Sequence, residues 1–429
     1  GSNNVAVGRS ALQNQTTGAS NVAVGYNAAL SITTGIQNTS IGGFSLASNT
    51  TAAGNTAIGF GTLYTNTTGA SNTAVGLNAL NLNTTGTQNT AVGESALVAN
   101  TIGANNTAIG REALKANTEG SFNVAMGRTS LTTNTTGSNN VALGYQALNA
   151  STTADANTAL GHNSLSASTT GSGNTAVGSL SGDAITTGVN NTTVGRASLT
   201  TCTTGGSNVA MGVSALEGLT TGSNNVAIGP NTGGAITTGY ENTCIGKSAG
   251  DAITTGNNNI IIGQSVDPDS ASQAHAIVIG VGFTGAGNDF SFGKASNVVS
   301  NDFNADANWS RSSDERLKKN VTNQSLGLDF INNLRTVKYN WKASNELDST
   351  DAQLAHLYKE DAADNEMDTD VVMHNFIAQE VKAALDTAGV SDFGGWKEDH
   401  HGVQQVSREM FVIPLVKAMQ EQTAVIAAL

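Results

Sequence analysis

The chain has 429 residues, a formal net charge of −13 and a pI of about 4.8. Only 12% of its residues are charged, and it contains 50 glycines and 3 prolines, which is typical of a disordered or repeat-built chain rather than a globular enzyme. It has neither a basic cluster for nucleic acid nor an apolar run long enough for membrane insertion, so we expect neither kind of partner.

Residues 1–263 repeat with a period of 17. The motif Asn-x-Ala-(Val/Ile)-Gly places its glycine at Gly8 and at every seventeenth position through Gly263, which makes sixteen copies because 263 − 8 is 15 × 17. Its Asn recurs from Asn4 through Asn259. The strict period excludes disorder. Because 17 residues cannot bury their own apolar side chains, the stacked repeats are predicted to form a β-solenoid, or β-roll, with one coil per repeat.

Each repeat predicts one short strand. The residue directly before the motif Gly is apolar, the residue two places earlier is usually Val or Thr, and the residue between them is usually Ala. This alternation is typical of a strand with one buried face. Leu usually follows that Gly by four residues, and the copies with Ala29, Gly182, Gly233 or Gly250 there carry Ile three residues later. We interpret these copies as turn variants that fill the same core position.

The Asn column is expected to stack as a ladder of hydrogen-bonded amides, with ligand or ion binding along the column as the alternative. Sixteen coils stacked at strand spacing predict a rod of roughly 70–75 Å.

The phrase Asn-x-Ala-Val-Gly-x-x-Ala-Leu resembles the head repeats of trimeric autotransporter adhesins throughout residues 1–263, although the present repeat is lengthened by a Thr-Thr-Gly segment. The resemblance implies a left-handed roll and a trimer. Thin coils with apolar faces also favour a homotrimer in which three rolls bury a common axis.

The motif ends at Gly263, and residues 264–312 are expected to form a short interlaced β connector. The β-like run Ala276–Gly280 and the alternating Phe290 and Phe292 support that prediction. The two cysteines, Cys202 and Cys244, rule out a disulfide framework.

At Ser313 the composition changes to that of an α/β domain, which we place at 313–429. Its expected elements are a helix at 325–334, a strand at 337–341, an acidic insert at 345–370, a strand at 371–377 and a helix at 378–385. Apolar residues at Val416, Met419 and Ile426 predict a C-terminal coiled-coil helix, which again indicates an oligomer.

Three phrases resemble the C-terminal intramolecular chaperones of endosialidase tailspikes and phage fibres: Ser-Asp-Glu-Arg-Leu-Lys-Lys-Asn-Val at 313–321, Phe-Ile-Ala-Gln-Glu-Val at 376–381 and Leu-Val-Lys-Ala-Met-Gln-Glu-Gln at 415–422. The resemblance implies a domain that trimerises, folds the shaft and then cuts itself off. Ser313 would be the nucleophile, Lys318 its base, and Ser312–Ser313 the scissile bond. An unprotonated Lys is required, so assembly must desolvate Lys318; solvated surface charge is the alternative for this residue.

The leading hypothesis is therefore a homotrimeric tail fibre or receptor-binding protein of a bacteriophage virion, which attaches to a host surface receptor, either a glycan or an outer-surface protein. Gly1 lies inside a repeat, so we expect the natural N-terminus upstream, with the tail or capsid adaptor. A bacterial trimeric surface adhesin is the alternative. A tailspike glycan hydrolase is least favoured, because residues 1–263 hold only eight acids scattered over sixteen coils. No cofactor, metal or activity on external substrates is predicted.

Overall fold

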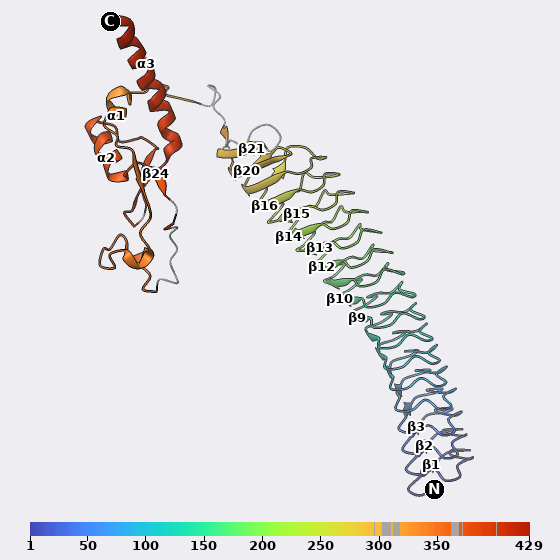
Figure 1. The fold of residues 1–429 in the computed structure, drawn as a ribbon. Coiled ribbons are helices and arrows are strands. Elements are labelled where there is room, and N and C mark those ends of the chain that lie inside the picture. Colours follow the sequence, from blue (N-terminus) through green and yellow to red (C-terminus); the bar gives the residue numbers. More distant parts are fainter. Residues whose placement is uncertain (296, 303–309, 312–317, 362–368, 371, 400) are drawn as a thin grey trace. The chain divides into compact units, whose positions relative to one another are not determined.

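The computed structural model describes residues 1–429 except 296, 303–309, 312–317, 362–368, 371 and 400. The chain separates into two compact units, Gly1–Ser312 and Ser313–Leu429. Figure 1 shows the strands of the first unit stacked in chain order from β1 toward β21, one above another.

One strand per repeat forms the first unit, as the sequence pattern predicts. The fifteen three-residue strands are β1 (Val5–Val7), β2 (Val22–Val24), β3 (Thr39–Ile41), β4 (Thr56–Ile58), β5 (Thr73–Val75), β6 (Thr90–Val92), β7 (Thr107–Ile109), β8 (Val124–Met126), β9 (Val141–Leu143), β10 (Thr158–Leu160), β11 (Thr175–Val177), β12 (Thr192–Val194), β13 (Val209–Met211), β14 (Val226–Ile228) and β15 (Thr243–Ile245). Each strand pairs in parallel with the next, 17 residues on, as Val5 does with Val22. The chain is thus a mostly β protein with a β-solenoid shaft.

The stack continues beyond Gly263. Strand β16 (Ile260–Gln264) pairs in parallel with β18 (Ile277–Val281) at the same 17-residue step, and β18 pairs with β20 (Asp289–Lys294) after a step of 13, since Ile277 faces Phe290. The expectation that the period ends at Gly263 is therefore wrong. The reason is that Asn259 Oδ1 accepts the backbone N–H of Ala276 at 2.9 Å, so the next coil needs no Asn of its own.

The stack ends where the pairing changes direction. Strand β21 (Asn297–Asp302) is antiparallel to β20, and β22 (Ser310–Arg311) is antiparallel to β21. Two further short strands, β17 (Asp267–Pro268) and β19 (Thr284–Gly285), pair in parallel beside the last coils. An antiparallel strand laid on the last coil satisfies its open edge, which stops further stacking.

The inner face of each strand is the alanine face. Ala23, Ala57 and the other alanines of this column beyond the first coil are fully buried, whereas the Val, Thr, Ile, Leu or Met residues on either side of them are not buried. Ile58, for example, is 37% exposed. The coil is too thin to hold two layers of large side chains, so only alanine or a similarly small residue fits inside most strands.

Leucine fills the rest of each coil. Leu114 and its equivalents are fully buried, and in the coils with Gly182 or Gly233 the interior is filled by Ile185 and Ile236, also fully buried. A Cβ atom on Gly182 would lie 3.0 Å from Ile185 Cδ1, which shows that Leu and Ile occupy the same space. The backbone is alike in both cases, with φ of 50° at Leu114 and 59° at Gly182, so these are not two different turns.

The asparagine ladder is present as predicted. Asn106 links successive coils: its backbone N–H and its Nδ2 both donate to Asn89 Oδ1, at 3.0 and 3.1 Å, and its Oδ1 accepts the N–H of Asn123 at 3.0 Å. Its Nδ2 also donates to the carbonyl oxygen of Gly120 at 2.8 Å. A second buried ladder was not predicted. It links Asn49, Asn66, Asn83, Asn100, Asn117 and Asn134 through their side-chain amides.

The second unit is a small α/β fold. Its elements are α1 (Leu328–Asn332), β23 (Val337–Tyr339), η2 (Ser344–Glu346), η3 (Ala355–Leu357), β24 (Met373–Asn375), α2 (Ala378–Thr387), β25 (Trp396–Glu398), β26 (Gln404–Val406), η5 (Arg408–Phe411) and α3 (Val412–Ala428). Strands β23 and β24 form one antiparallel pair, and β25 and β26 another. The core consists of Leu326, Phe330, Val381, Ala384, Leu385 and Phe411. The first predicted helix is shorter than expected, because Gly327, with φ of −127° and ψ of −141°, has a non-helical backbone and α1 begins only after it.

Candidate functional site

The predicted cleavage bond lies outside the described residues, because neither Ser312 nor Ser313 is among them. Lys318 is described and its side chain is exposed. The Ser313–Lys318 dyad therefore stays a prediction that requires burial of the lysine by assembly.

Helix α3 is hydrogen-bonded to the first residue of α1, near the start of the C-terminal unit. Glu421 Oε2 accepts the backbone N–H of Leu328 at 2.7 Å, at the first residue of α1, and Lys417 lies 3.2 Å from Glu421 Oε1. The Leu328 hydrogen bond and then Lys417 lower the pKa of Glu421. The phrase at 415–422 thus ties the last helix of the chain to the segment that follows the predicted cleavage point.

The phrase at 376–381 builds the core of the same unit. The ring of Phe376 lies 4.8 Å from that of Phe411, and Val381 is fully buried. Glu380 accepts a hydrogen bond from Arg335 Nε at 3.1 Å, and this pairing lowers the pKa of Glu380. Two of the three family phrases therefore serve the folding of the unit, while Val321 at the end of the first is 73% exposed.

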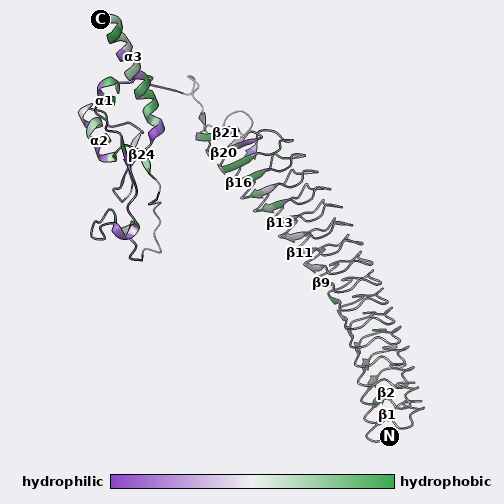
Figure 2. Cartoon of the chain, in the orientation of Figure 1, coloured by the Kyte–Doolittle hydropathy of each residue, from purple (hydrophilic) through white to green (hydrophobic). Residues whose placement is uncertain are grey.

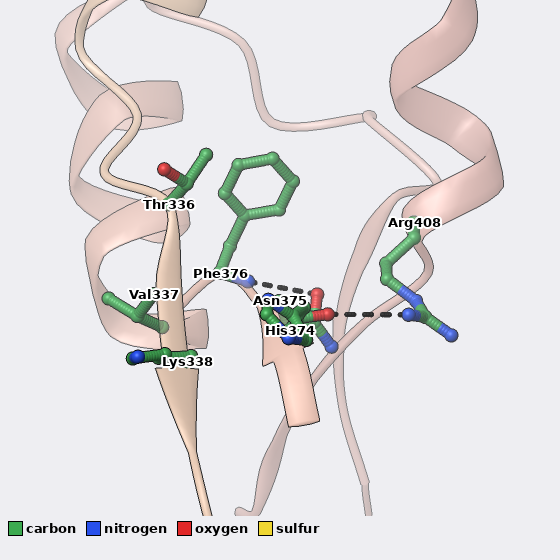
Figure 3. Close-up of a pocket in the computed structure, with 7 residues that line it drawn as sticks. All are labelled: Thr336, Val337, Lys338, His374, Asn375, Phe376 and Arg408. Carbon is green, nitrogen blue, oxygen red and sulfur yellow. Dashed lines mark hydrogen bonds between the residues drawn. The ribbon is translucent and has the colours of Figure 1, made fainter. Parts of the chain in front are cut away.

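A cavity of about 460 Å³ lies between the β23–β24 pair and η5 (Figure 3). Its lining residues are Thr336, Val337, Lys338, His374, Asn375, Phe376 and Arg408, none of which is acidic. Arg408 Nη1 donates to the carbonyl oxygen of His374 at 3.3 Å, and Asn375 Oδ1 accepts the N–H of Phe376 at 2.9 Å. The sequence pattern assigned Lys338 and Arg408 no role, because only the strand pairing brings Lys338 opposite His374.

A second, larger cavity of about 700 Å³ opens beside the same strand pair. Tyr339 and Trp341 line it with a ring separation of 5.3 Å, together with Leu347, Leu354 and Ile377. The acidic insert thus contributes the apolar side chains of Leu347 and Leu354 to the wall of this cavity.

Helix α3 presents an apolar face that the described part of the chain leaves uncovered. Val416, Met419 and Ile426, which the sequence placed on a coiled-coil seam, are 48%, 67% and 65% exposed. Val416 and Met419 also line a shallow groove with Gln420 and Thr423. A helix with such a face is stable in water when other helices cover it.

The shaft presents a second apolar surface, which we call the apolar stripe. It consists of the last outward residue of each strand before the motif Gly, and Figure 2 shows hydrophobic colour recurring on these strands. None of its members is buried in the single chain: Val7, Val24, Ile41, Ile58, Val75, Val92, Ile109, Met126, Leu143, Leu160, Val177, Val194, Met211, Ile228, Ile245, Ile262 and Ile279. An apolar row of this length on a water-exposed surface marks an interface.

In the described ranges of the chain, no set of three or more His, Cys, Asp and Glu side chains is arranged to hold a metal ion. No described helix is both long and apolar enough to cross a membrane. Burial raises the pKa of Cys202 to about 11 and, with a smaller contribution from Asp267, that of Cys244 to about 12, so both thiols stay protonated and unreactive at neutral pH.

Comparison with known proteins identifies the second unit. Residues 313–390 match the family model described as the chaperone of endosialidase. No curated protein and no solved structure matches the chain. The match begins at Ser313, the first residue of the second compact unit. Residues 313–390 of the C-terminal unit thus match the chaperone-of-endosialidase family, and together with the β-solenoid that precedes them in the chain this fits a tail fibre with a C-terminal chaperone domain.

Proposed function

We propose that the chain forms a homotrimeric tail fibre of a bacteriophage virion, which attaches to a receptor on the host surface and whose C-terminal domain directs trimerisation and folding of the shaft. The observation that carries this proposal is the presence of uncovered apolar surfaces on both units, the apolar stripe and the face of α3, in a chain with a chaperone domain.

A trimer around the stripe is energetically reasonable. Burying the remaining 37% of the Ile58 side chain contributes about 0.5–1 kcal/mol. If all seventeen members of the stripe contributed as much, the sum would be about 9–17 kcal/mol per protomer, an upper estimate that is comparable to the stability of a domain. Three stripes facing one axis would bury every member at once.

We further propose that assembly triggers cleavage at Ser312–Ser313. Ser313 Oγ attacks the carbonyl carbon of Ser312 while its proton passes to the neutral amine of Lys318. The Ser312–Ser313 C–N bond breaks, the released amino group of Ser313 takes up a proton, and an ester joins the two residues. Water hydrolyses this ester and leaves a carboxylate on Ser312. The chain acts only on itself in this scheme.

The trimer is tested by a charge placed on the stripe. Ile58→Asp should shift the assembly from trimer to monomer in light scattering, because it places three like charges at one level of the axis. The matched control is Thr68→Asp. Thr68 is an exposed residue of the same repeat and lies outside the stripe, so this variant should leave the trimer intact. A monomeric wild type, or equal behaviour of the two variants, contradicts the proposed interface.

Cleavage is tested by intact-mass analysis of purified protein. Wild type should release a fragment of residues 313–429, whereas Ser313→Ala and Lys318→Ala should stay full-length and trimeric and Lys319→Ala should still cut. Cutting in Ser313→Ala excludes the dyad. A wild type that never cuts but needs residues 313–429 to fold retains the chaperone role and excludes the protease role.

The second candidate is a bacterial trimeric adhesin, which the adhesin-like repeat favours. The two candidates share the trimer and differ in what precedes Gly1: a secretion signal for the adhesin and a tail or capsid adaptor for the fibre. Sequencing the gene upstream of this point distinguishes them.

A further inference from the structure

Aromatic residues are concentrated in one short part of the shaft. Residues 1–263 contain seven of them, which are Tyr26, Phe44, Phe60, Tyr64, Phe122, Tyr145 and Tyr240. Four of the seven belong to the second, third and fourth coils. We call these four residues, together with Arg9 of the first coil, the aromatic patch.

The four rings form one cluster on the surface. Phe44 lies at the centre of the cluster and is half-buried. The rings of Tyr26, Phe60 and Tyr64 stand edge-to-face to the Phe44 ring, with centroid-to-centroid distances of 5.1, 5.7 and 6.2 Å. The three outer residues are 45%, 57% and 41% exposed. The Arg9 guanidinium carbon lies 5.7 Å from the centroid of Tyr26.

The solenoid itself does not require these rings. The column that holds Tyr26 and Phe60 holds Arg111, Ser179 and Arg196 in other coils, with the same strand register. Beneath the patch the core is already closed, because Leu46 and Leu63 are fully buried. Exposed aromatic groups that add nothing to the core indicate a contact with something outside the chain.

The extent of the patch distinguishes it from the apolar stripe. The stripe runs through every coil from β1 to β18, as a contact between copies around a shaft axis must. The patch occupies only coils one to four, and Phe60 lies two residues beyond Ile58 of the stripe, past Gly59 with its φ of 134°. A local surface of this kind fits a local ligand better than a further shaft-length interface.

The chemistry of the patch fits a saccharide. The C–H groups on the face of a pyranose ring pack well against aromatic rings, whose faces are negatively polarised. Tyrosine hydroxyls and the Arg9 guanidinium supply hydrogen-bond partners at the edge. No Asp or Glu occurs in residues 1–93, so a carboxylate on the sugar would meet a cation and no repelling acid. Tyr26 and Phe60 are two coils apart, about 10 Å, which leaves room for more than one sugar ring.

We propose that the aromatic patch is a saccharide-binding site on the side of the shaft, with Arg9 favouring sugars that carry a carboxylate. This inference rests on the proposed attachment function and names the surface and the ligand class for it. The rings provide most of the binding free energy, because contact with the sugar removes their apolar surface from water. Arg9 provides selectivity for acidic over neutral sugars.

Binding is measured with the full chain on immobilised oligosaccharides, one set neutral and one set bearing sialic or uronic acids. The double variant Phe60→Ala/Tyr64→Ala should lose at least tenfold in affinity, and Arg9→Gln should weaken binding of the acidic set only. Tyr240→Ala is the matched control, since Tyr240 is 46% exposed in a distant coil, and it should bind as wild type does. Trimer content and melting temperature should be unchanged in all variants.

Three results would overturn the inference. A trimeric wild type that binds none of the saccharides removes the ligand class while leaving the proposed trimer in place. Saccharide binding that survives Phe60→Ala/Tyr64→Ala removes the site. Dissociation of the trimer by the same double variant shows that the rings contact another copy of the chain instead. The proposed function fails separately, if wild type is monomeric.

Discussion

Removal of one rung from the first asparagine ladder should destabilise the shaft measurably. In Asn106→Ala, the backbone N–H of Asn123 loses its buried acceptor, while the Gly120 carbonyl loses one of two donors and keeps Asn117 Nδ2 at 2.9 Å. An unsatisfied buried donor costs about 1–3 kcal/mol, and the lost bonds of the amide add about 1 kcal/mol. We therefore expect a decrease of about 2–4 kcal/mol in the free energy of unfolding per protomer.

The assay is equilibrium unfolding in denaturant, combined with hydrogen exchange at the Asn123 amide. The matched control is Asn149→Ala, since Asn149 is half-buried outside both ladders, and its effect should stay within about 0.5 kcal/mol. Exchange at Asn123 should accelerate in Asn106→Ala only. If the two variants unfold at the same denaturant concentration, the ladder does not stabilise the stack and the reasoning fails.

Three further outcomes are expected. Gly182→Leu should lower the free energy of unfolding by about 1–3 kcal/mol in a thermal melt, because the new side chain crowds Ile185. Adding Ile185→Ala should restore most of this stability. If Gly182→Leu leaves the stability unchanged, Leu and Ile do not share one core space. Burial and then the charge of Asp251 raise the pKa of Asp267, so stability should fall as pH rises above about 4. Asp267→Asn should therefore be more stable than wild type in urea at pH 7 but equal at pH 3, and equality at both would exclude a charge penalty. Deleting two repeats should shorten the shaft by about 10 Å in electron micrographs, and an unchanged length would refute one coil per repeat.

The candidate site was only partly accessible from the sequence. The motif at 313–321 pointed to the family that matches residues 313–390, but the role of Ser313 and Lys318 follows from the resemblance and stays a prediction. The Glu421–Leu328 hydrogen bond joins residues 93 apart in the chain, and no local pattern signals such a contact. The same holds for the cavity of Lys338, His374 and Arg408.

The sequence by itself determined the stack, its 17-residue register and the first asparagine ladder. The reason is that each coil lies on a copy of itself, so a residue type repeated in one column necessarily meets its own kind in the next coil. The same logic applies to the second ladder, because Asn recurs at every seventeenth position from Asn49 to Asn134.

Only the tertiary structure decided which face of each strand lies inside. Both faces carry apolar residues, and the closure of a thin coil places alanine inward and leaves Ile58 and its equivalents outside. It also decided that the stack runs on through β18 and β20, where the motif is lost but the backbone pairing remains. It brought the rings of Tyr26, Phe44 and Tyr64 together from three different columns. Such choices depend on how the chain turns between strands and on what space is left, which residue periodicity alone does not specify.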